Sequence, residues 1–153
     1  MADLEMVRTI MTQAVPFNRV LALQFVAIEP ERAEVVLPEA PERLNHVGTI
    51  HAAAQFGLGE AASGAMVMGA FADLQGQGYI PLAAGAQIAY RKPAKGDLRG
   101  VATLSTTEQA RVRADIETNG KARFSVPVQL LDAQGVMTTE ITVEWALIKP
   151  RAS

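Results

Sequence analysis

The feature that most constrains this chain is an almost uncharged segment that runs from Thr49 to about Phe71. Glu60 is the only acidic or basic residue between His51 and Asp73. The segment is too long for one strand, and its apolar residues would lie all round a helix, so protein must surround it. Alanine and glycine make up much of it, which lets a neighbouring layer approach closely. We therefore expect one long buried helix at the centre of the fold.

Most of the remaining sequence has the pattern of β-strands joined by tight turns. Two short strands flank a turn at residues 29–32, and two long strands flank a turn at residues 132–135. Strands joined by hairpins pair antiparallel. The strands are expected at residues 21–28, 33–37, 86–91, 98–105, 122–131 and 136–148. One buried helix and about six strands predict an α+β fold, in which a curved antiparallel sheet is wrapped around a single long central helix.

A short amphipathic helix is expected near the N-terminus, because apolar residues recur at helical spacing over residues 4–14. Asp3 is suited to cap its start, and Pro16 marks its end. We interpret this element as a helix laid over one edge of the core. The alternative is a lid over a ligand.

A second short helix is expected between the two pairs of later strands. Thr106 as N-cap and Gln109 three residues later have the pattern of a capping box. The helix should end at residues 119–120, where Asn-Gly provides a C-terminal stop. Residues 73–85 are expected to form a loop.

Length and composition limit the function classes. The 153 residues suit one domain, residues 1–153. A net charge of -2 argues against binding to nucleic acid. The chain has no cysteine and two histidines, which excludes disulfides and thiolate sites, and we expect no metal and no cofactor. The N-terminus carries acidic residues and lacks the apolar core of a signal peptide, so we expect a cytoplasmic protein with no membrane partner.

The lone acid of the central helix is the first candidate for chemistry. A carboxylate on an otherwise apolar helix is costly unless it is paired, hydrated or neutralised. Glu60 is therefore a candidate catalytic group. The alternatives are a place at a dimer interface or a salt bridge to an arginine.

The start of the same helix is the second candidate. Backbone N–H groups at a helix N-terminus are unsatisfied, and those of His51, Ala52 and Ala53 could hold an oxyanion. Asn45 could assist, or could only cap the loop before the helix. Ala52 and Glu60 are eight residues apart, which is about 12 Å along a helix. One acyl carbonyl cannot touch both, so two copies of the chain with antiparallel central helices would have to share the site.

These residues resemble the motif of the hotdog-fold acyl-CoA thioesterases, in particular the phenylacetate-pathway type. The resemblance rests on the segment from Asn45 to Ala53, Asn-His-Val-Gly-Thr-Ile-His-Ala-Ala, followed by Glu60. The family pattern is Asn, then Gly-Thr-(Leu/Ile)-His-Gly-Gly, then Asp or Glu on the helix. Further support comes from Ile-Ala-Tyr at residues 88–90 and from the turn at residues 93–97, and the order of elements matches over almost the whole chain.

The resemblance implies a hotdog fold and hydrolysis of acyl-CoA by a homodimer, or by a homotetramer built from it. Glu60 would be the catalytic carboxylate, as a general base or as a nucleophile. The amide of Ala52, which replaces the first glycine of the motif, would bind the thioester oxygen, and Asn45 would hold the carbonyl or orient water. Many relatives also place a serine or threonine on the following strand, whereas residues 82–85 of this chain are Leu-Ala-Ala-Gly.

Basic residues near the turn after residue 90 are candidates for binding the phosphates of CoA. They are Arg91, Lys92, Lys95 and Arg99. The alternative is an ordinary solvated turn. His51 is interpreted mainly as a residue that shapes the helix start, and Tyr90 and Trp145 as core or interface residues.

Two other functions remain open at this point. A hotdog hydratase or dehydratase would use a histidine and an acid across the dimer, and His46 and Glu60 are 14 residues apart. The proline-rich loop of those enzymes is absent, since Val-Gly-Thr-Ile stands at residues 47–50. A non-catalytic acyl-CoA binding module is the third hypothesis. A purely structural role has no support in the sequence.

Overall fold

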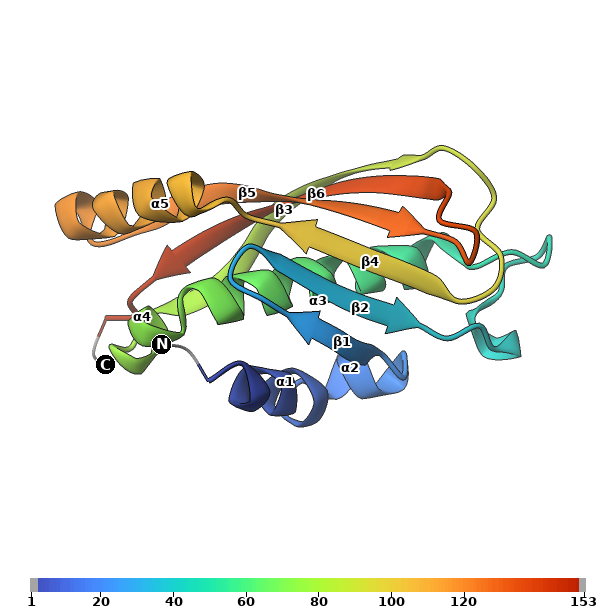
Figure 1. Cartoon of the computed structure of the whole chain (residues 1–153), viewed down its shortest axis with the longest axis horizontal. Helices are drawn as coiled ribbons and strands as arrows, with labels where there is room; N and C mark the ends of the chain where they lie inside the picture. Colours follow the sequence, from blue (N-terminus) through green and yellow to red (C-terminus); the bar gives the residue numbers. More distant parts are fainter. Residues whose placement is uncertain (1–2, 152–153) are drawn as a thin grey trace.

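The computed structural model of the protein describes residues 3–151. Figure 1 shows one long helix lying along the inner side of a sheet, with two short helices beside the first strand. The helices are α1 (Leu4–Gln13), α2 (Pro16–Val20), α3 (Ala52–Ala70), α4 (Ala72–Gly76), α5 (Thr106–Asn119) and the 3-10 helix η1 (Pro41–Arg43). The strands are β1 (Gln24–Ile28), β2 (Arg32–Leu37), β3 (Ile80–Tyr90), β4 (Leu98–Thr103), β5 (Ala122–Leu131) and β6 (Met137–Ile148).

The strands form one sheet in the order β1-β2-β4-β5-β6-β3, and each neighbouring pair is antiparallel. The two hairpins expected from the sequence, β1 with β2 and β5 with β6, are present. Strands β1 and β3 are the two edges of the sheet. The prediction of a curved antiparallel sheet around one central helix is confirmed.

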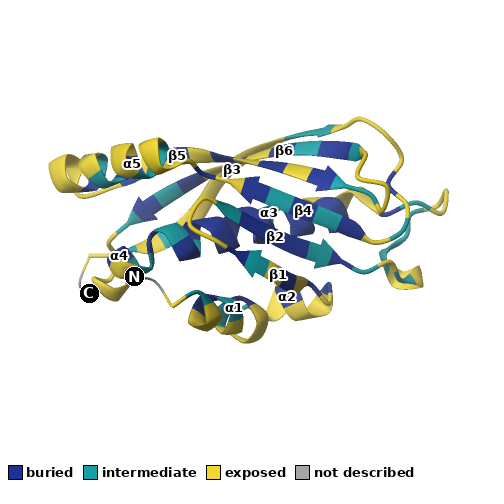
Figure 2. Cartoon of the chain, viewed as in Figure 1, coloured by how far each residue is buried: buried dark blue, intermediate teal, exposed yellow. Residues whose placement is uncertain are grey.

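Helix α3 is buried because the sheet packs on one side of it and the N-terminal helices pack on another. Figure 2 shows buried residues concentrated where β2 and β4 lie over α3. The small residues of α3 make this close packing possible. An added methyl group at Gly59 would run into the side chain of Ile141 on β6. The helix N-terminus is fixed separately, because the Ile50 amide donates to the carbonyl of Ala94 over 2.8 Å.

Helix α1 covers one edge of the core, as the first of its two interpretations predicts. The carboxylate of Asp3 accepts hydrogen bonds from the amides of Glu5 and Met6, and so caps the helix start. Val7 and Met11 are buried, and the helix contacts α3 and β1. Pro16 does not only end this run but also begins α2.

The prediction of a loop over residues 73–85 is wrong. Residues 72–76 form α4, and β3 begins at Ile80. The first half of β3 is Ile-Pro-Leu-Ala-Ala-Gly, a poor strand sequence by intrinsic preference, but it pairs with β6 from Ile148 to Glu144. Tertiary pairing has overridden local preference here.

The N-cap of α5 is Ser105, one residue before the predicted Thr106. The hydroxyl oxygen of Ser105, and not of Thr106, accepts from the amide of Glu108 at 3.2 Å. The side chain of Gln109 donates to two carbonyls outside the helix, so no capping box forms. The predicted end is confirmed, because Gly120 has a left-handed conformation with a φ of 71°. Within residues 3–151, no helix is long and apolar enough to cross a membrane.

Candidate active site

Of the three backbone amides expected to be free at the start of α3, the structure leaves one without an acceptor. The His51 amide donates to the carbonyl of Arg43 at 2.8 Å, and the Ala53 amide donates to Nδ1 of His51 at 3.0 Å. The Ala52 amide has no acceptor among residues 3–151. His51 is therefore the N-cap of α3, which is the structural role expected for it. The amide that remains for an oxyanion is that of Ala52.

The side chain of Asn45 organises the loop before α3. Its oxygen accepts from the amides of Val47 and Thr49 at 3.0 and 3.1 Å, and its nitrogen donates to the Thr49 hydroxyl at 2.8 Å. This is the loop-capping arrangement. One N–H of the amide group is left for another acceptor, since the group carries two.

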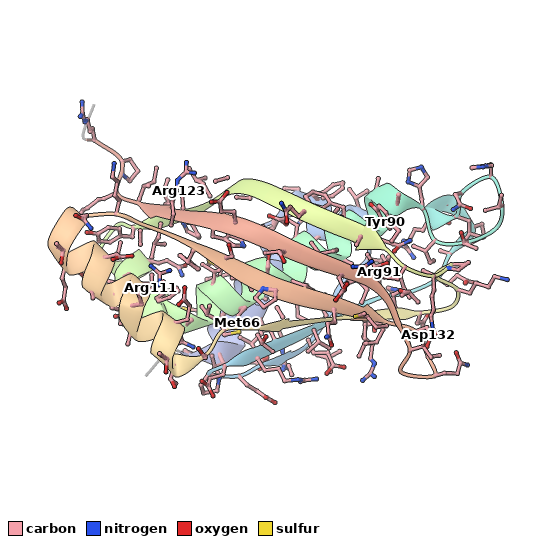
Figure 3. All side chains as sticks on the ribbon, turned by 90° about the horizontal axis from the view of Figure 1, so that it is seen from above. Met66, Tyr90, Arg91, Arg111, Arg123 and Asp132 are labelled. Atoms are coloured by element: carbon pink, nitrogen blue, oxygen red, sulfur yellow. The ribbon has the colours of Figure 1, made fainter. Side chains whose placement is uncertain are left out.

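A groove of about 360 Å³ lies over this helix start. It is lined by Asn45, Val47, Thr49, Ile50, Ala52, Gln55, Tyr90, Arg91, Lys92, Pro93 and Ala94. Figure 3 shows Tyr90 and Arg91 close together near the end of β3, far from α5. The groove thus brings the free amide together with two basic side chains.

Tyr90 is a site residue that the sequence did not identify. Its hydroxyl donates to the carbonyl of Ala52 at 3.1 Å, and its side chain is 49% exposed, so it is not a core residue. Trp145, in contrast, is buried, and its indole N–H donates to the hydroxyl of Ser63 at 3.0 Å. Trp145 is therefore confirmed as a core residue, whereas Tyr90 is not part of the core.

The four basic residues do not form one cluster. Arg91 and Lys92 line the groove, and the Arg91 guanidinium also pairs with Glu140 at 2.8 Å. Lys95 lies in the adjoining turn and does not line the groove. Arg99 belongs to β4 and pairs with Glu34 of β2 at 3.3 Å. Only Arg91 and Lys92 are placed to meet a ligand that contacts the start of α3.

Glu60 lies two turns along α3 and is partly buried. Within residues 3–151 its carboxylate has no ion pair and no hydrogen bond, so no arginine of the same chain compensates it. Burial disfavours the charged form and raises the pKa of the Glu60 carboxyl above its ordinary value. A carboxylate with a raised pKa is a better proton acceptor than an ordinary one, as a general base requires.

Ala52, Phe56 and Glu60 share the one face of this half of α3 that other elements leave open. Phe56 is 36% exposed, while the residues between it and Glu60 are buried. Spacing by four residues puts the three side chains on one helix face. Glu60 is about 12 Å from Ala52 along the axis and does not line the groove.

Other parts of the molecule offer less chemistry. A groove of about 880 Å³ lies between β3, β5, β6 and the end of α5 and includes no residue of α3. No three acidic or histidine side chains within residues 3–151 are arranged to hold a metal ion. His46 is exposed in the loop before α3, and the structure shows no contact between it and Glu60.

The architecture matches known structures. PA5026 of Pseudomonas aeruginosa, a protein of unknown function described as a probable thioesterase, is 27% identical, with 97% of each chain covered and a TM-score of 0.85. A mutant form of the thioesterase SAV0944 of Staphylococcus aureus is 17% identical over 89% of this chain and 100% of its own, with a TM-score of 0.70.

The PaaI protein of the phenylacetic acid degradation operon of E. coli is 12% identical, over 98% of this chain and 96% of its own, with a TM-score of 0.74. No curated protein matches the chain. The likeness to these structures shows that the protein has the hotdog fold, which confirms the expectation from the sequence. Residues 4–147 match the family described as domain of unknown function DUF4442, and the protein therefore belongs to this family of hotdog proteins.

Proposed function

We propose that the protein is an acyl-CoA thioesterase whose active site is shared between two copies of the chain. The observation that carries this proposal is the open face of α3. It holds a free amide at Ala52 and an unpaired carboxylate at Glu60, about 12 Å apart. Neither group has a hydrogen-bond or ion-pair partner among residues 3–151 of its own chain. Two antiparallel copies of α3 would bring the amide of one chain beside the carboxylate of the other.

The edge strand β3 supports assembly into a homodimer. Residues 80–90 contain no charged side chain, and most of them are exposed. Natural proteins usually protect an open edge with charges or with a covering element. Pairing of β3 with the same strand of a second copy would extend the sheet and satisfy its free backbone groups. It would also bring the two α3 helices together, since β3 contacts α3.

In the proposed reaction, the thioester carbonyl oxygen accepts a hydrogen bond from the Ala52 amide. Glu60 of the other chain takes a proton from water, and the water oxygen bonds to the carbonyl carbon. The negative charge that develops on the carbonyl oxygen is stabilised by the amide and the helix dipole. The carbon–sulfur bond then breaks, and protonated Glu60 returns its proton to the CoA sulfur. The products are a carboxylic acid and free CoA.

Glu60 could instead bond directly to the carbonyl carbon and form an anhydride that water then hydrolyses. A single turnover in ¹⁸O-labelled water distinguishes the routes. Direct attack by water puts the label only in the released acid. If Glu60 attacks and water then hydrolyses the anhydride at the Glu60 carbonyl, the label enters Glu60 and the released acid is unlabelled, a result that direct attack by water cannot give.

The groove at the start of α3 is the proposed place of the CoA end of the substrate. Arg91 and Lys92 would meet its phosphates, with Lys95 nearby, while Asn45 retains one N–H to hold the carbonyl or a water. Arg99 is less suited to bind a phosphate, because its guanidinium already pairs with the carboxylate of Glu34.

A free-thiol assay with short, medium, long and aromatic acyl-CoAs tests the proposal. Glu60→Gln should lower kcat by at least about 100-fold, the effect expected for loss of a general base. Glu117→Gln, an exposed position on α5, is the matched control and should leave kcat unchanged. Unchanged turnover in folded Glu60→Gln protein would refute the proposal. Saturable acyl-CoA binding without hydrolysis would identify a binding module, and hydration of enoyl-CoA without thiol release would identify a hydratase.

A further inference from the structure

Phe56 is the one large side chain on the open face of α3. It is the only aromatic residue among the 19 residues of the helix. It stands one turn after Ala52 and one turn before Glu60, about 6 Å along the axis from each. Its side chain is 36% exposed, although the helix around it is built largely from alanine and glycine.

The spacing locates Phe56 in the shared site. If Ala52 of one chain faces Glu60 of an antiparallel partner, the two-fold axis passes near the residue halfway between them, which is position 56. Each Phe56 would then face the second copy of itself. The pair would lie between the two thioester sites and would form a common wall.

The direction of the acyl group follows from the same geometry. The CoA end leaves through the groove with Arg91 and Lys92, on one side of the carbonyl held by Ala52. The sheet closes α3 on the side of Gln55 and Leu58, and the side chains of Phe17 and Leu21 close it at Gly57. The remaining direction runs along the open face, towards Phe56.

We propose that Phe56 limits the length of the acyl group and makes short acyl chains the preferred substrates. This inference rests on the proposed function and deepens it. An apolar side chain that stands about 6 Å along the helix axis from the carbonyl-binding amide leaves room only for a short chain. A long flexible acyl chain would clash with the two Phe56 side chains.

The test compares chain-length preference in Phe56→Ala, Phe56→Leu and Phe56→Tyr. The readout is the ratio of kcat/KM for decanoyl-CoA to that for butanoyl-CoA. Phe56→Ala should raise this ratio by at least about tenfold, because one methylene in an apolar pocket already changes discrimination by that amount. Phe56→Leu should give a smaller rise, and Phe56→Tyr should keep the wild-type ratio. Val20→Ala, which removes an exposed apolar side chain on α2, is the control and should not change it.

Non-hydrolysable thioether analogues of the same two substrates give a corresponding ratio of Kd values. This ratio depends only on binding, so it separates the two proposals. A wild-type ratio in dimeric Phe56→Ala and Phe56→Leu, with hydrolysis still dependent on Glu60, would overturn the role of Phe56 and leave the thioesterase intact. Absence of hydrolysis together with a shifted Kd ratio would support the wall and refute the reaction. Preference of the wild-type protein for decanoyl-CoA would overturn the inference directly.

Discussion

A partly buried carboxylate without a partner lowers the stability of the fold that carries it. Burial raises the pKa of Glu60, so between its ordinary pKa and the raised value the folded protein binds more protons than the unfolded chain. The free energy of unfolding therefore falls as pH rises through this window. This destabilisation is absent below the ordinary pKa of a glutamate and complete above the raised pKa of Glu60.

Glu60→Gln removes this cost, and we expect the variant to be more stable than the wild type at pH 7 and nearly equal to it at pH 4. Urea unfolding at both pH values, with the oligomeric state held the same, measures the difference. Glu117→Gln should show no such dependence. A variant that is less stable at pH 7 would mean that Glu60 has a favourable partner in the assembled protein.

Tyr90 is expected to act through Ala52 and not by touching the reacting atoms. Its hydroxyl fixes the first turn of α3 by a hydrogen bond to the Ala52 carbonyl. A single hydrogen bond of this kind contributes about 1 kcal/mol, so Tyr90→Phe should lower kcat by about fivefold. The affinity for free CoA should stay unchanged, because the ring and the groove remain.

Tyr79→Phe is the control for this change. Tyr79 is the other tyrosine of the chain, and its ring lies near the ammonium group of Lys149, outside the groove. It should keep the wild-type kcat. A fall in CoA affinity with unchanged kcat in Tyr90→Phe would show that the hydroxyl binds ligand and does not position the helix.

The candidate site could be predicted from the sequence only where local rules apply. The isolation of Glu60 and the orphan amides at the start of α3 follow from residue type and helix geometry. The hydrogen bonds that occupy the amides of His51 and Ala53, and leave that of Ala52 free, depend on how the loop folds. The role of Tyr90 could not be predicted, because Tyr90 contacts Ala52 from 38 residues away in the sequence. An aromatic residue at a strand end has no local sign of such a contact.

At the scale of elements, close approach between α3 and β6 sets the core. Gly59 faces the side chain of Ile141, which is buried, so an added methyl group forces repacking. Gly64, one turn further, has its nearest neighbours at 3.5 Å, an ordinary contact distance for a methyl group. The same substitution at two positions of one helix should therefore have opposite effects.

We expect Gly59→Ala to destabilise the protein by about 1–3 kcal/mol, the usual cost of overpacking. Gly64→Ala should be neutral or stabilising by up to about 1 kcal/mol, because alanine is the better helix former. Chemical denaturation of both variants gives the comparison. Equal effects at the two positions would show that α3 can shift away from β6.

The elements were predictable where their signal is local. A long uncharged segment, a cap at Asp3 and a stop at Gly120 all act within a few residues, and each prediction from them is confirmed. The first half of β3 carries no such signal, since alanine and glycine favour neither strand nor sheet edge. Its pairing with β6 supplies the stability that its sequence lacks, and pairing partners cannot be read from one segment alone.

For the whole molecule, the two edges of the sheet are unequal. The guanidinium of Arg8 on α1 donates to the backbone carbonyl of Val26, at 3.1 Å, and so covers the free edge of β1. Figure 1 shows α1 and α2 beside this strand. Neither edge strand carries a charge, but β3 is longer than β1 and mostly exposed. Of the two edges, β3 is therefore the one suited to pair with a second copy.

This difference predicts where a charge disrupts assembly. Ala86→Glu places a carboxylate on exposed β3, beside its own copy in the proposed dimer, where like charges that lose water cost several kcal/mol. The dimer Kd should rise by about 100-fold or more, and thioesterase activity should fall with it, since each site needs both chains. Val26→Glu puts the same charge on the other edge and should leave both unchanged. Sedimentation and turnover measured over a range of protein concentrations test this, and a fully active monomeric Ala86→Glu variant would show that one chain holds a complete site.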